Sequence, residues 1–381
     1  MKIHTWYRSN FEHRLSGRYI HIDSINPLLN YNKDKLEIIE KWYSEKGEPI
    51  PLIKIGNGKK IVLGWSQMHG NESTTTKAIF DFLRFIDQKE HFQPEIERFL
   101  NSFSFYVFPI LNPDGARSYT RENANNVDLN RDAQELSQPE SKCLSEAFKM
   151  LNPSLCLNLH DQRSIFGLSN GKAAQVSFLS PAANKERSIT PARQVAMERI
   201  VAINSVLQTF IPGQVGRYDD SFNDACVGDS FQMAGVPTIL FEAGHSGQDY
   251  AREKSREYVF YALLSVFNIL SSNNKLSYND YFKIPENQKN YRDIILRNVK
   301  IKGQKDQVSV AIQYKEALKD GKIIFEPFID EMGNLKNYHG HFEKDIKGEE
   351  ILTIPQNNLT VGAKISDLVD RMNNSLLIFV K

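Results

Sequence analysis

The sequence predicts a layered α/β fold with a mainly parallel sheet, followed by a small β-rich domain. Up to about residue 270, short apolar runs alternate with segments of helical periodicity, the pattern of parallel strands joined by helices. Beyond residue 273 short β-like runs take over. The 381 residues therefore divide into an expected domain of residues 1–275, with its core at about 50–270, and a second domain of residues 281–381.

The first core elements fall between residues 51 and 111. PLIKI and KIVLGW flank a Gly-Asn-Gly turn and predict a hairpin over residues 51–65, because glycine and asparagine favour tight turns. Residues 73–88 show apolar positions at helical spacing, with Ser73 or Thr74 as the cap. FSFYVFPIL (103–111) is typical of a strand.

The second half of the first domain continues the alternation. Residues 112–137 are rich in Asn, Asp and Arg and predict a long loop, after which Pro139 opens a helix that runs to Met150. The remaining elements are a strand at 155–160, a helix at 190–210, a strand at 236–244 and a helix at 250–270.

The last hundred residues differ from the first domain in their pattern of apolar and polar residues. Residues 271–280 are polar and predict a linker. Four β-like runs follow, at 293–301, 308–314, 322–329 and 376–380. No internal repeat is visible in the sequence.

Composition excludes several classes of protein. Lys+Arg is 47 and Asp+Glu is 46, so no net field favours nucleic acid or an anionic membrane as a partner. No run of 18 apolar residues predicts a transmembrane helix, and the N-terminal residues lack the apolar stretch of a secretory signal. The three cysteines are odd in number and widely spaced, which favours reduced thiols. We therefore expect a cytoplasmic protein; the oligomeric state is left open.

Three residues predict a metal site. His69 and Glu72 follow the apolar run that ends at residue 66, and His160 ends a second run. The ends of neighbouring strands in open α/β sheets meet at the ligand crevice. Two histidines and a glutamate with an open fourth position form a catalytic zinc set. The alternatives are an ordinary polar loop and a structural histidine, because a His-x-x-Glu pair alone is a weak signal.

Two other features suit catalysis. Residues 108–134 bring Arg121, Asn130 and Arg131 into one long segment, and arginine presents a planar fork to carboxylates. A solvated surface loop is the alternative, although long loops are often functional. Glu242 lies near the end of a buried strand, where a carboxylate is costly unless paired or active. It is either satisfied by an arginine or a general base.

Five segments follow one another along the chain: HGNE (69–72), NPDG (112–115), TRENANNVDLNRD (120–132), LNLH (157–160) and TILFEAG (238–244). Together, and in this order, they resemble the zinc metallocarboxypeptidases of the carboxypeptidase A type. The resemblance covers about residues 50–270 and implies a three-layer α/β/α domain with a mixed, mainly parallel sheet. It implies one zinc ion held by His69, Glu72 and His160, with Asp128 orienting the first histidine.

The resemblance also implies catalytic roles. Glu242 matches the general base, and Arg121 matches the arginine that polarises the scissile carbonyl. Asn130 and Arg131 match the pair that binds the terminal carboxylate of the substrate. Tyr218 is the counterpart of a mobile tyrosine, although the residues around it match poorly.

The resemblance leaves the substrate open. HGNE has Gly-Asn where many animal members carry an arginine, and it looks more like bacterial branches. We expect a metallocarboxypeptidase acting on a peptide or acylamino acid with a free carboxylate. A muropeptide amidase or deacylase on the same fold, or a non-catalytic zinc-containing binding module, are the alternatives. A His2Glu set selects zinc only loosely. The His339-x-His341 pair is interpreted as a coincidence without a third ligand, His245 as a turn histidine, and Asp161 as bonding only locally.

Overall fold

The structure is a computed structural model whose chain forms two compact units. It describes residues 2–31, 36–88, 90–271, 277–301, 305–354, 359–365, 367–370 and 376–378. Unit 1 comprises Met1–Gln162, Ala174–Gly244 and Ala251–Asn287. Unit 2 comprises Arg163–Ala173, His245–Tyr250 and Gln288–Lys381. The domain boundaries expected from the sequence stay a prediction.

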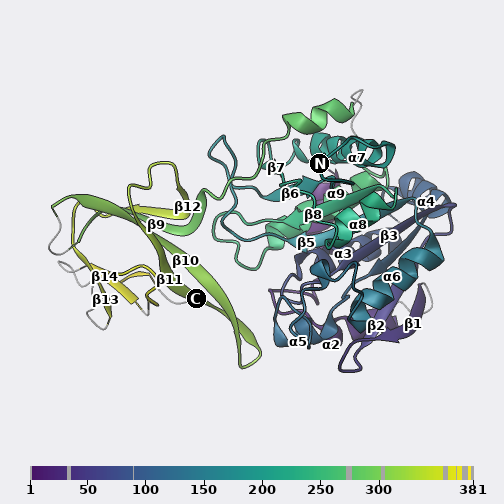
Figure 1. Cartoon of the computed structure of the whole chain (residues 1–381), viewed down its shortest axis with the longest axis horizontal. Coiled ribbons are helices and arrows are strands. Elements are labelled where there is room, and N and C mark those ends of the chain that lie inside the picture. The colour runs from purple at the N-terminus through teal and green to yellow at the C-terminus, as the bar shows by residue number, and fades with distance from the viewer. Residues whose placement is uncertain are drawn as a thin grey trace. The chain divides into compact units, whose positions relative to one another are not determined.

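Unit 1 is built on an eight-stranded sheet in the order β1-β2-β4-β3-β5-β8-β6-β7 (Figure 1). The central strands β4, β3, β5 and β8 run parallel to one another. The β1–β2, β2–β4 and β6–β8 pairs are antiparallel, and β6 and β7 are parallel. The mixed, mainly parallel sheet is thereby confirmed. The strands are β1 (Glu37–Tyr43), β2 (Pro49–Ile55), β3 (Lys60–Ser66), β4 (Phe103–Phe108), β5 (Leu155–Asp161), β6 (Val176–Leu179), β7 (Val215–Arg217) and β8 (Thr238–Ala243).

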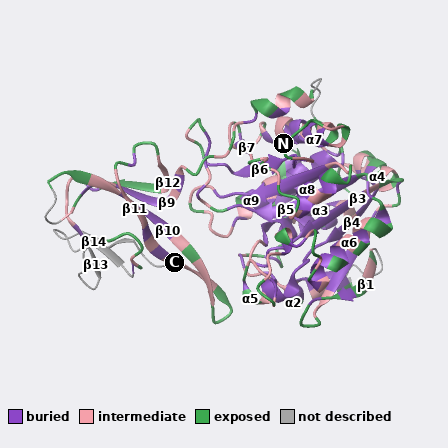
Figure 2. Ribbon diagram, in the orientation of Figure 1, coloured by how far each residue is buried: buried purple, intermediate pink, exposed green. Residues whose placement is uncertain are grey.

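Helices cover both faces of this sheet. On β3, Val62 packs into one core, with α3, α7 and α9, while its neighbour Leu63 packs into the other, with α6 and α8. Adjacent strand residues point to opposite faces, so a central strand such as β5 is buried along its whole length (Figure 2). The helices are α1 (Lys2–Asn10), α2 (Ile22–Tyr31), α3 (Thr74–Asp87), α4 (Gln93–Ser102), α5 (Pro113–Ser118), η1 (Leu129–Arg131), α6 (Pro139–Leu151), α7 (Pro191–Leu207), α8 (Val227–Met233), α9 (Glu253–Val266) and η2 (Tyr278–Lys283).

The hairpin predicted over residues 51–65 is wrong. Both strands exist, but β4 lies between β2 and β3 and pairs with each of them. The Gly-Asn-Gly segment instead packs on the junction of α4 and β4, where the Asn57 and Gly58 N–H groups donate to Leu100 O and Phe103 O. A β-carbon on Gly58 would lie 1.9 Å from the carbonyl carbon of Ser102. The glycine is therefore required by close backbone approach, not by a two-residue turn.

The long loop predicted over residues 112–137 is also corrected. It contains the short helix α5 and the 3-10 turn η1. The side chain of Asn112 caps α5 by accepting from the Gly115 N–H, and Asp128 caps η1 by accepting from the Asn130 N–H. The Asn and Asp residues that suggested an irregular loop thus act as caps of short helices. Strands β1, β6 and β7 and helices α1, α2, α4 and α8 were not predicted.

Unit 2 is rich in β-structure, as predicted. A four-stranded sheet has the order β11-β10-β9-β12 and a three-stranded sheet the order β13-β14-β15. The predicted linker at 271–280 includes residues 272–276, which lie outside the described residues, as do residues 379 and 380 of the last predicted strand. The strands are β9 (Tyr291–Lys300), β10 (Gln307–Lys319), β11 (Lys322–Gly333), β12 (His339–Asp345), β13 (Ile351–Ile354), β14 (Asp367–Asp370) and β15 (Leu376–Ile378).

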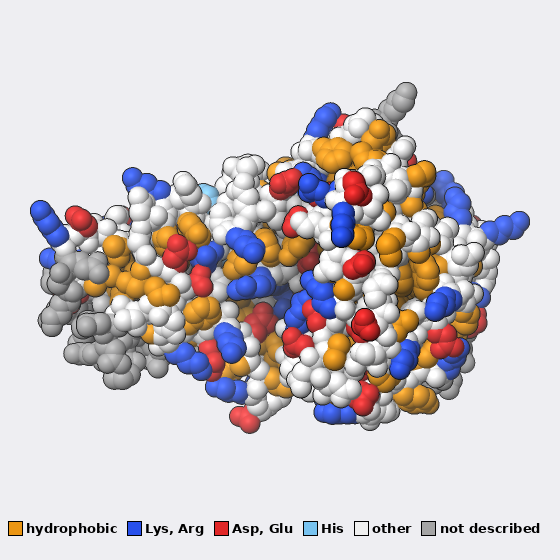
Figure 3. Space-filling view, viewed as in Figure 1, with side chains coloured by type: hydrophobic (Ala, Val, Ile, Leu, Met, Phe, Trp, Pro, Cys, Tyr) orange, Lys and Arg blue, Asp and Glu red, His pale blue; other side chains and the backbone are white. Residues whose placement is uncertain are grey.

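Surface charge and helix composition agree with the sequence. On the face of unit 1 drawn in Figure 3, basic and acidic side chains lie interspersed, as the near-zero net charge predicts. Within the described part of the chain, no helix combines the length and apolar character needed to span a bilayer.

Candidate metal and catalytic site

The HGNE segment forms the tight connection between β3 and α3. Its Gly70 lies against the backbone of α5, where an added β-carbon would lie 2.0 Å from the carbonyl carbon of Gly115. Asn112 reaches the same connection, because its N–H donates to Gln67 O and its side-chain amide donates to Met68 O. The HGNE and NPDG motifs therefore pack against each other and form one corner at the carboxyl ends of β3 and β4.

Three side chains converge at this corner. His69 Nδ1 lies 2.9 Å from Glu72 Oε1, and His160 Nδ1 lies 2.9 Å from Glu72 Oε2. The two Nδ1 atoms are 3.1 Å apart. His69 and His160 are buried. His160 stands at the end of β5, so the parallel register of β3 and β5 brings the two ligand segments together.

This set fits a zinc ion. Two ligands of one tetrahedral zinc ion lie about 3.3 Å apart, because each Zn–N bond measures about 2.0–2.1 Å. The observed separations are close to that value. The two Nδ1 atoms face each other with room for at most one proton between them. At least one of them therefore presents a lone pair toward the centre of the cluster, where a metal ion would bind. Among the residues that the structure describes, this is the one group of three or more His, Cys, Asp or Glu that could hold a metal ion.

Electrostatics keep Glu72 in the form that binds metal. Burial acts to raise its pKa, but the charges and hydrogen bonds of His69 and His160 outweigh burial and hold the pKa of Glu72 well below its usual range. A metal ligand must be deprotonated. The carboxylate is anchored further by the Asp161 N–H, which donates to Glu72 Oε2 over 3.1 Å.

Asp128 supports the first histidine and the neighbouring arginine at once. Its Oδ1 lies 3.0 Å from His69 Nε2, while its Oδ2 accepts from Nε and Nη2 of Arg121 at 3.1 and 2.9 Å. Burial opposes ionisation, but the hydrogen bond and charge of His69, with Arg121, hold the pKa of Asp128 below its usual range. A carboxylate on the outer imidazole nitrogen fixes the tautomer of a metal-binding histidine.

Arg121 extends from this pair toward the predicted metal cluster. Its Nη1 lies 3.6 Å from Glu72 Oε1 and 3.2 Å from His69 Nδ1. The side chain is 40% exposed, so one edge of the guanidinium contacts Asp128 while the group remains open to solvent. This placement suits a donor for an oxyanion that develops near the cluster.

Glu242 is a buried carboxylate one strand away. Residue 242 on β8 stands in register with His160 on β5. Burial raises the pKa of Glu242 well above its usual range, and the charge of Glu72 adds to the effect. Its Oε2 atom has no hydrogen-bond partner among the described residues. The alternative of a glutamate fully satisfied by an arginine is therefore not what the structure shows.

The residues expected to bind substrate lie in η1 and directly after β7. Asn130 follows Asp128 in η1, and its side-chain oxygen accepts from the Val227 N–H at the start of α8. Arg131 is exposed, with Nη1 donating to the Asn130 carbonyl. Tyr218 follows β7; burial, with the charge of Glu242, raises its pKa above the usual range.

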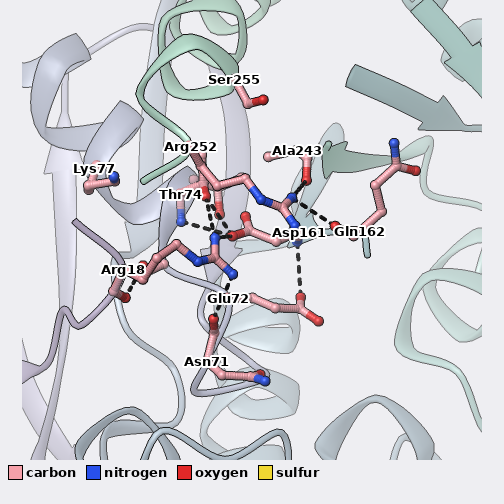
Figure 4. Close-up of polar contacts among 12 residues, drawn as sticks. Arg18, Asn71, Glu72, Thr74, Lys77, Asp161, Gln162, Ala243, Arg252 and Ser255 are labelled. Atoms are coloured by element: carbon pink, nitrogen blue, oxygen red, sulfur yellow. Dashed lines mark hydrogen bonds and ion pairs between the residues drawn. The ribbon is translucent and has the colours of Figure 1, made fainter. Parts of the chain in front are cut away.

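Two buried arginines hold the strand ends and were not singled out by sequence. Arg18 pairs with Asp161, its Nη1 lying 2.8 Å from Oδ2 (Figure 4). The Nη1 of Arg252 donates to the carbonyls of Gln162, Ala243 and Gly244, at the ends of β5 and β8. Asp161 was interpreted as bonding only locally, and that is wrong: its partners are 143 and 87 residues away. No local sequence signal marks such pairs.

His245 lies in a turn, as predicted, whereas His341 contacts a residue 177 positions away in the chain. His245 Nε2 contacts Gly247 O within a turn, and His341 Nε2 contacts Ser164 O. Neither they nor His339 belongs to the metal-binding group described above. Cys143 and Cys156 are buried free thiols, and Cys226 is half-buried and free.

Comparison with known proteins places this site in context. The family model described as zinc carboxypeptidase matches residues 24–260. Mouse carboxypeptidase M is 31% identical over 144 residues, a match that spans 33% of this chain and 31% of that protein. Arabidopsis carboxypeptidase SOL1 is 28% identical over 103 residues, which span 24% of this chain and 21% of that protein. The chain thus matches only a third or less of these relatives' length.

Solved structures share the fold. The metallo-carboxypeptidase from Burkholderia cenocepacia superposes with a TM-score of 0.52 at 16% identity, covering 65% of this chain and 68% of that one. A Pseudomonas aeruginosa metallo-carboxypeptidase, solved in complex with (2-guanidinoethylmercapto)succinic acid, gives 0.51 at 19% identity, over 64% and 68%. At these identities the likeness shows the α/β architecture of unit 1.

Proposed function

Because the chain belongs to the zinc carboxypeptidase family, we propose that it is a zinc-dependent hydrolase that cleaves an amide bond next to a free C-terminal carboxylate. The observation that carries the proposal is the convergence of His69, Glu72 and His160 beside Glu242, whose Oε2 atom has no partner among the described residues. The ligand set alone would suit a binding module. A buried carboxylate beside it, with one oxygen that has no partner among the described residues, favours catalysis.

His69, Glu72 and His160 would hold the zinc ion. Zinc in such a site supplies Lewis acidity, which activates water and polarises a carbonyl. Asp128 keeps the outer nitrogen of His69 paired, and the Asp161 N–H restrains Glu72. The protein thereby fixes the ligands before metal arrives, which limits the cost of ordering them.

Glu242 serves as the general base. Its carboxylate accepts a proton from the attacking water and then donates that proton to the leaving amine, a role worth about 10²–10⁴-fold. Burial and the charge of Glu72 raise the pKa of Glu242. Its carboxylate therefore binds the proton of the attacking water more strongly than an exposed glutamate would, and it then transfers that proton to the leaving amine. A zinc ion held by His69, Glu72 and His160 would partly offset this rise in the pKa of Glu242.

Arg121 and the η1 residues position the substrate. Arg121 donates to the carbonyl oxygen as negative charge develops there, while Asp128 holds its guanidinium from behind. Asn130 and Arg131 bind the terminal carboxylate, and Tyr218 closes over the substrate. Charge-assisted hydrogen bonds to the terminal carboxylate of the substrate confine cleavage to the last residue of a peptide chain.

The experiment is a digest read by mass spectrometry. The zinc-loaded protein is incubated with peptides offered in pairs, one with a free C-terminus and one amidated, together with γ-glutamyl stem peptides and N-acyl amino acids. Glu242→Gln serves as the inactive variant. Glu97→Gln, an exposed glutamate on α4, is the control for the same change of charge.

Each outcome decides between the functions. Loss of single C-terminal residues from the free-acid peptides only, absent in Glu242→Gln, supports the carboxypeptidase. Cleavage of only the stem peptides or acylamino acids moves the function to an amidase or deacylase. Zinc binding with no cleavage of any substrate supports a non-catalytic binding module.

A further inference from the structure

Arg18 reaches the predicted metal site from a segment that the family model does not cover. It lies between α1 and α2, and the matched region begins at residue 24. Its side chain is 6% exposed, although the surrounding residues are a connecting segment. A buried guanidinium in such a place is costly unless its donors are paired.

The partners of Arg18 lie on both ligand-bearing segments. Nη1 donates to Asp161 Oδ2 at 2.8 Å and to Thr74 Oγ1 at 3.0 Å, and Nη2 lies 3.5 Å from Asn71 O (Figure 4). Asn71 and Thr74 flank the ligand Glu72, while Asp161 follows the ligand His160. One side chain therefore bridges the β3–α3 connection and the end of β5.

Asp161 transmits this contact to the predicted ligand. Its Oδ2 also accepts from the Thr74 N–H at 3.2 Å and from Thr74 Oγ1 at 2.6 Å, at the first turn of α3. The backbone N–H of Asp161 donates to Glu72 Oε2. If Asp161 shifts, the N–H that restrains Glu72 shifts with it.

We propose that Arg18 is a positioning residue for the metal site: by pairing with Asp161 it fixes the distance between the Glu72 segment and the His160 strand, and thereby sets metal affinity. This inference rests on the proposed function. This role places a residue that supports the predicted metal ligands in the N-terminal segment, which the family model does not cover.

A purely structural role for Arg18 is the competing explanation. The same segment is tied down elsewhere, because Tyr19 Oη donates to Arg117 O and Lys77 Nζ donates to Gly17 O. The backbone of Arg18 is also held, since its carbonyl accepts from Ser73 Oγ at 2.6 Å. These ties survive substitution of the Arg18 side chain, so its removal tests the ion pair and not the anchoring of the segment.

The test measures zinc affinity in the full chain. Arg18→Met removes the charge but keeps the stem, Arg18→Lys keeps the charge but not the two-pronged contact, and Tyr19→Phe is the control for tethering of the same segment. Zinc dissociation constants are measured by competition with a chromophoric chelator, and Co²⁺-substituted protein is examined by visible absorption. Circular dichroism and thermal melting confirm that each variant is folded.

We expect the zinc Kd of Arg18→Met to rise about 10- to 100-fold, the effect typical of residues that support metal ligands, with Arg18→Lys in between. The Co²⁺ spectrum should change in both variants and stay unchanged in Tyr19→Phe. If Arg18→Met does not fold, the Kd of Arg18→Lys decides.

Wild-type Kd and spectrum in Arg18→Met, or in Arg18→Lys where Arg18→Met does not fold, would overturn the inference while leaving the proposed function standing. So would an equal loss of affinity in Tyr19→Phe, because it would show that tethering of the segment is what matters. A wild-type protein that binds no zinc would overturn the proposed function, and this inference with it.

Discussion

Replacing Asp128 with asparagine tests the electrostatic link between the predicted metal ligands and Arg121, the proposed oxyanion donor. The carboxylate accepts from His69 Nε2 and the Asn130 N–H through Oδ1, and from Nε and Nη2 of Arg121 through Oδ2. Asparagine keeps one oxygen and replaces the other with an NH₂ group, which cannot accept. The variant can therefore retain the histidine contact or the arginine contact, but not both.

The magnitude follows from these contacts. Loss of the carboxylate behind His69 should raise the zinc Kd about 10- to 100-fold. At saturating zinc, Arg121 remains charged but loses its two-point anchor. We expect kcat/KM to fall about 10- to 100-fold, less than the 10²–10³-fold of deleting an oxyanion donor.

The assay combines chelator competition with the peptide digest. Asp132→Asn is the matched control, because Asp132 lies in the same segment but accepts from the Ser137 and Gln138 N–H groups instead of from His69 or Arg121. A variant Asp128→Asn that binds zinc and cleaves substrate as the wild type does would refute the reasoning. Equal losses in Asp132→Asn would show that disruption of the loop, and not the link through Asp128, is responsible.

Three further predictions concern the ligands, the buried charges and substrate binding. His160→Ala should reduce bound zinc from about one ion per chain to nearly none by elemental analysis, with the fold retained by circular dichroism; unchanged zinc would exclude this site. Asp81→Asn should lower the free energy of unfolding by about 3 kcal/mol in urea titration, because the fully buried Arg256 loses its fully buried carboxylate partner and keeps the partly exposed Glu253; an unaltered midpoint would contradict this. Asn130→Ala should raise KM for free-acid substrates in steady-state assays more than it lowers kcat, and the reverse pattern would argue against a role in binding the carboxylate.

The motifs could be read from sequence because each one is local. His69 and Glu72 lie three residues apart, and Asn112 and Asp128 cap the short helices that they precede. A strand end, a helix cap and a glycine in close backbone contact can each be recognised from a few neighbouring residues in the sequence. The meeting of His160 with this group was expected from strand-end geometry, and the parallel β3–β5 pairing accounts for it.

The order of the strands in the sheet could not be predicted from the sequence, because strands that pair with each other are distant along the chain. PLIKI and KIVLGW are adjacent in sequence, yet β4 separates them in the sheet. A Gly-Asn-Gly segment suits a hairpin turn and equally suits close packing on a helix end. Only the tertiary contacts with residues 100–103 distinguish the two.

The sequence by itself predicted the metal ligands and the carboxylate base, and it indicated the alternating elements that carry them. The tertiary structure decided what surrounds those residues. Arg18 and Asp161 are 143 residues apart, and neither is remarkable in its local context. Burial makes each charge depend on the other, and burial is a property of the packed fold that no short stretch of sequence encodes.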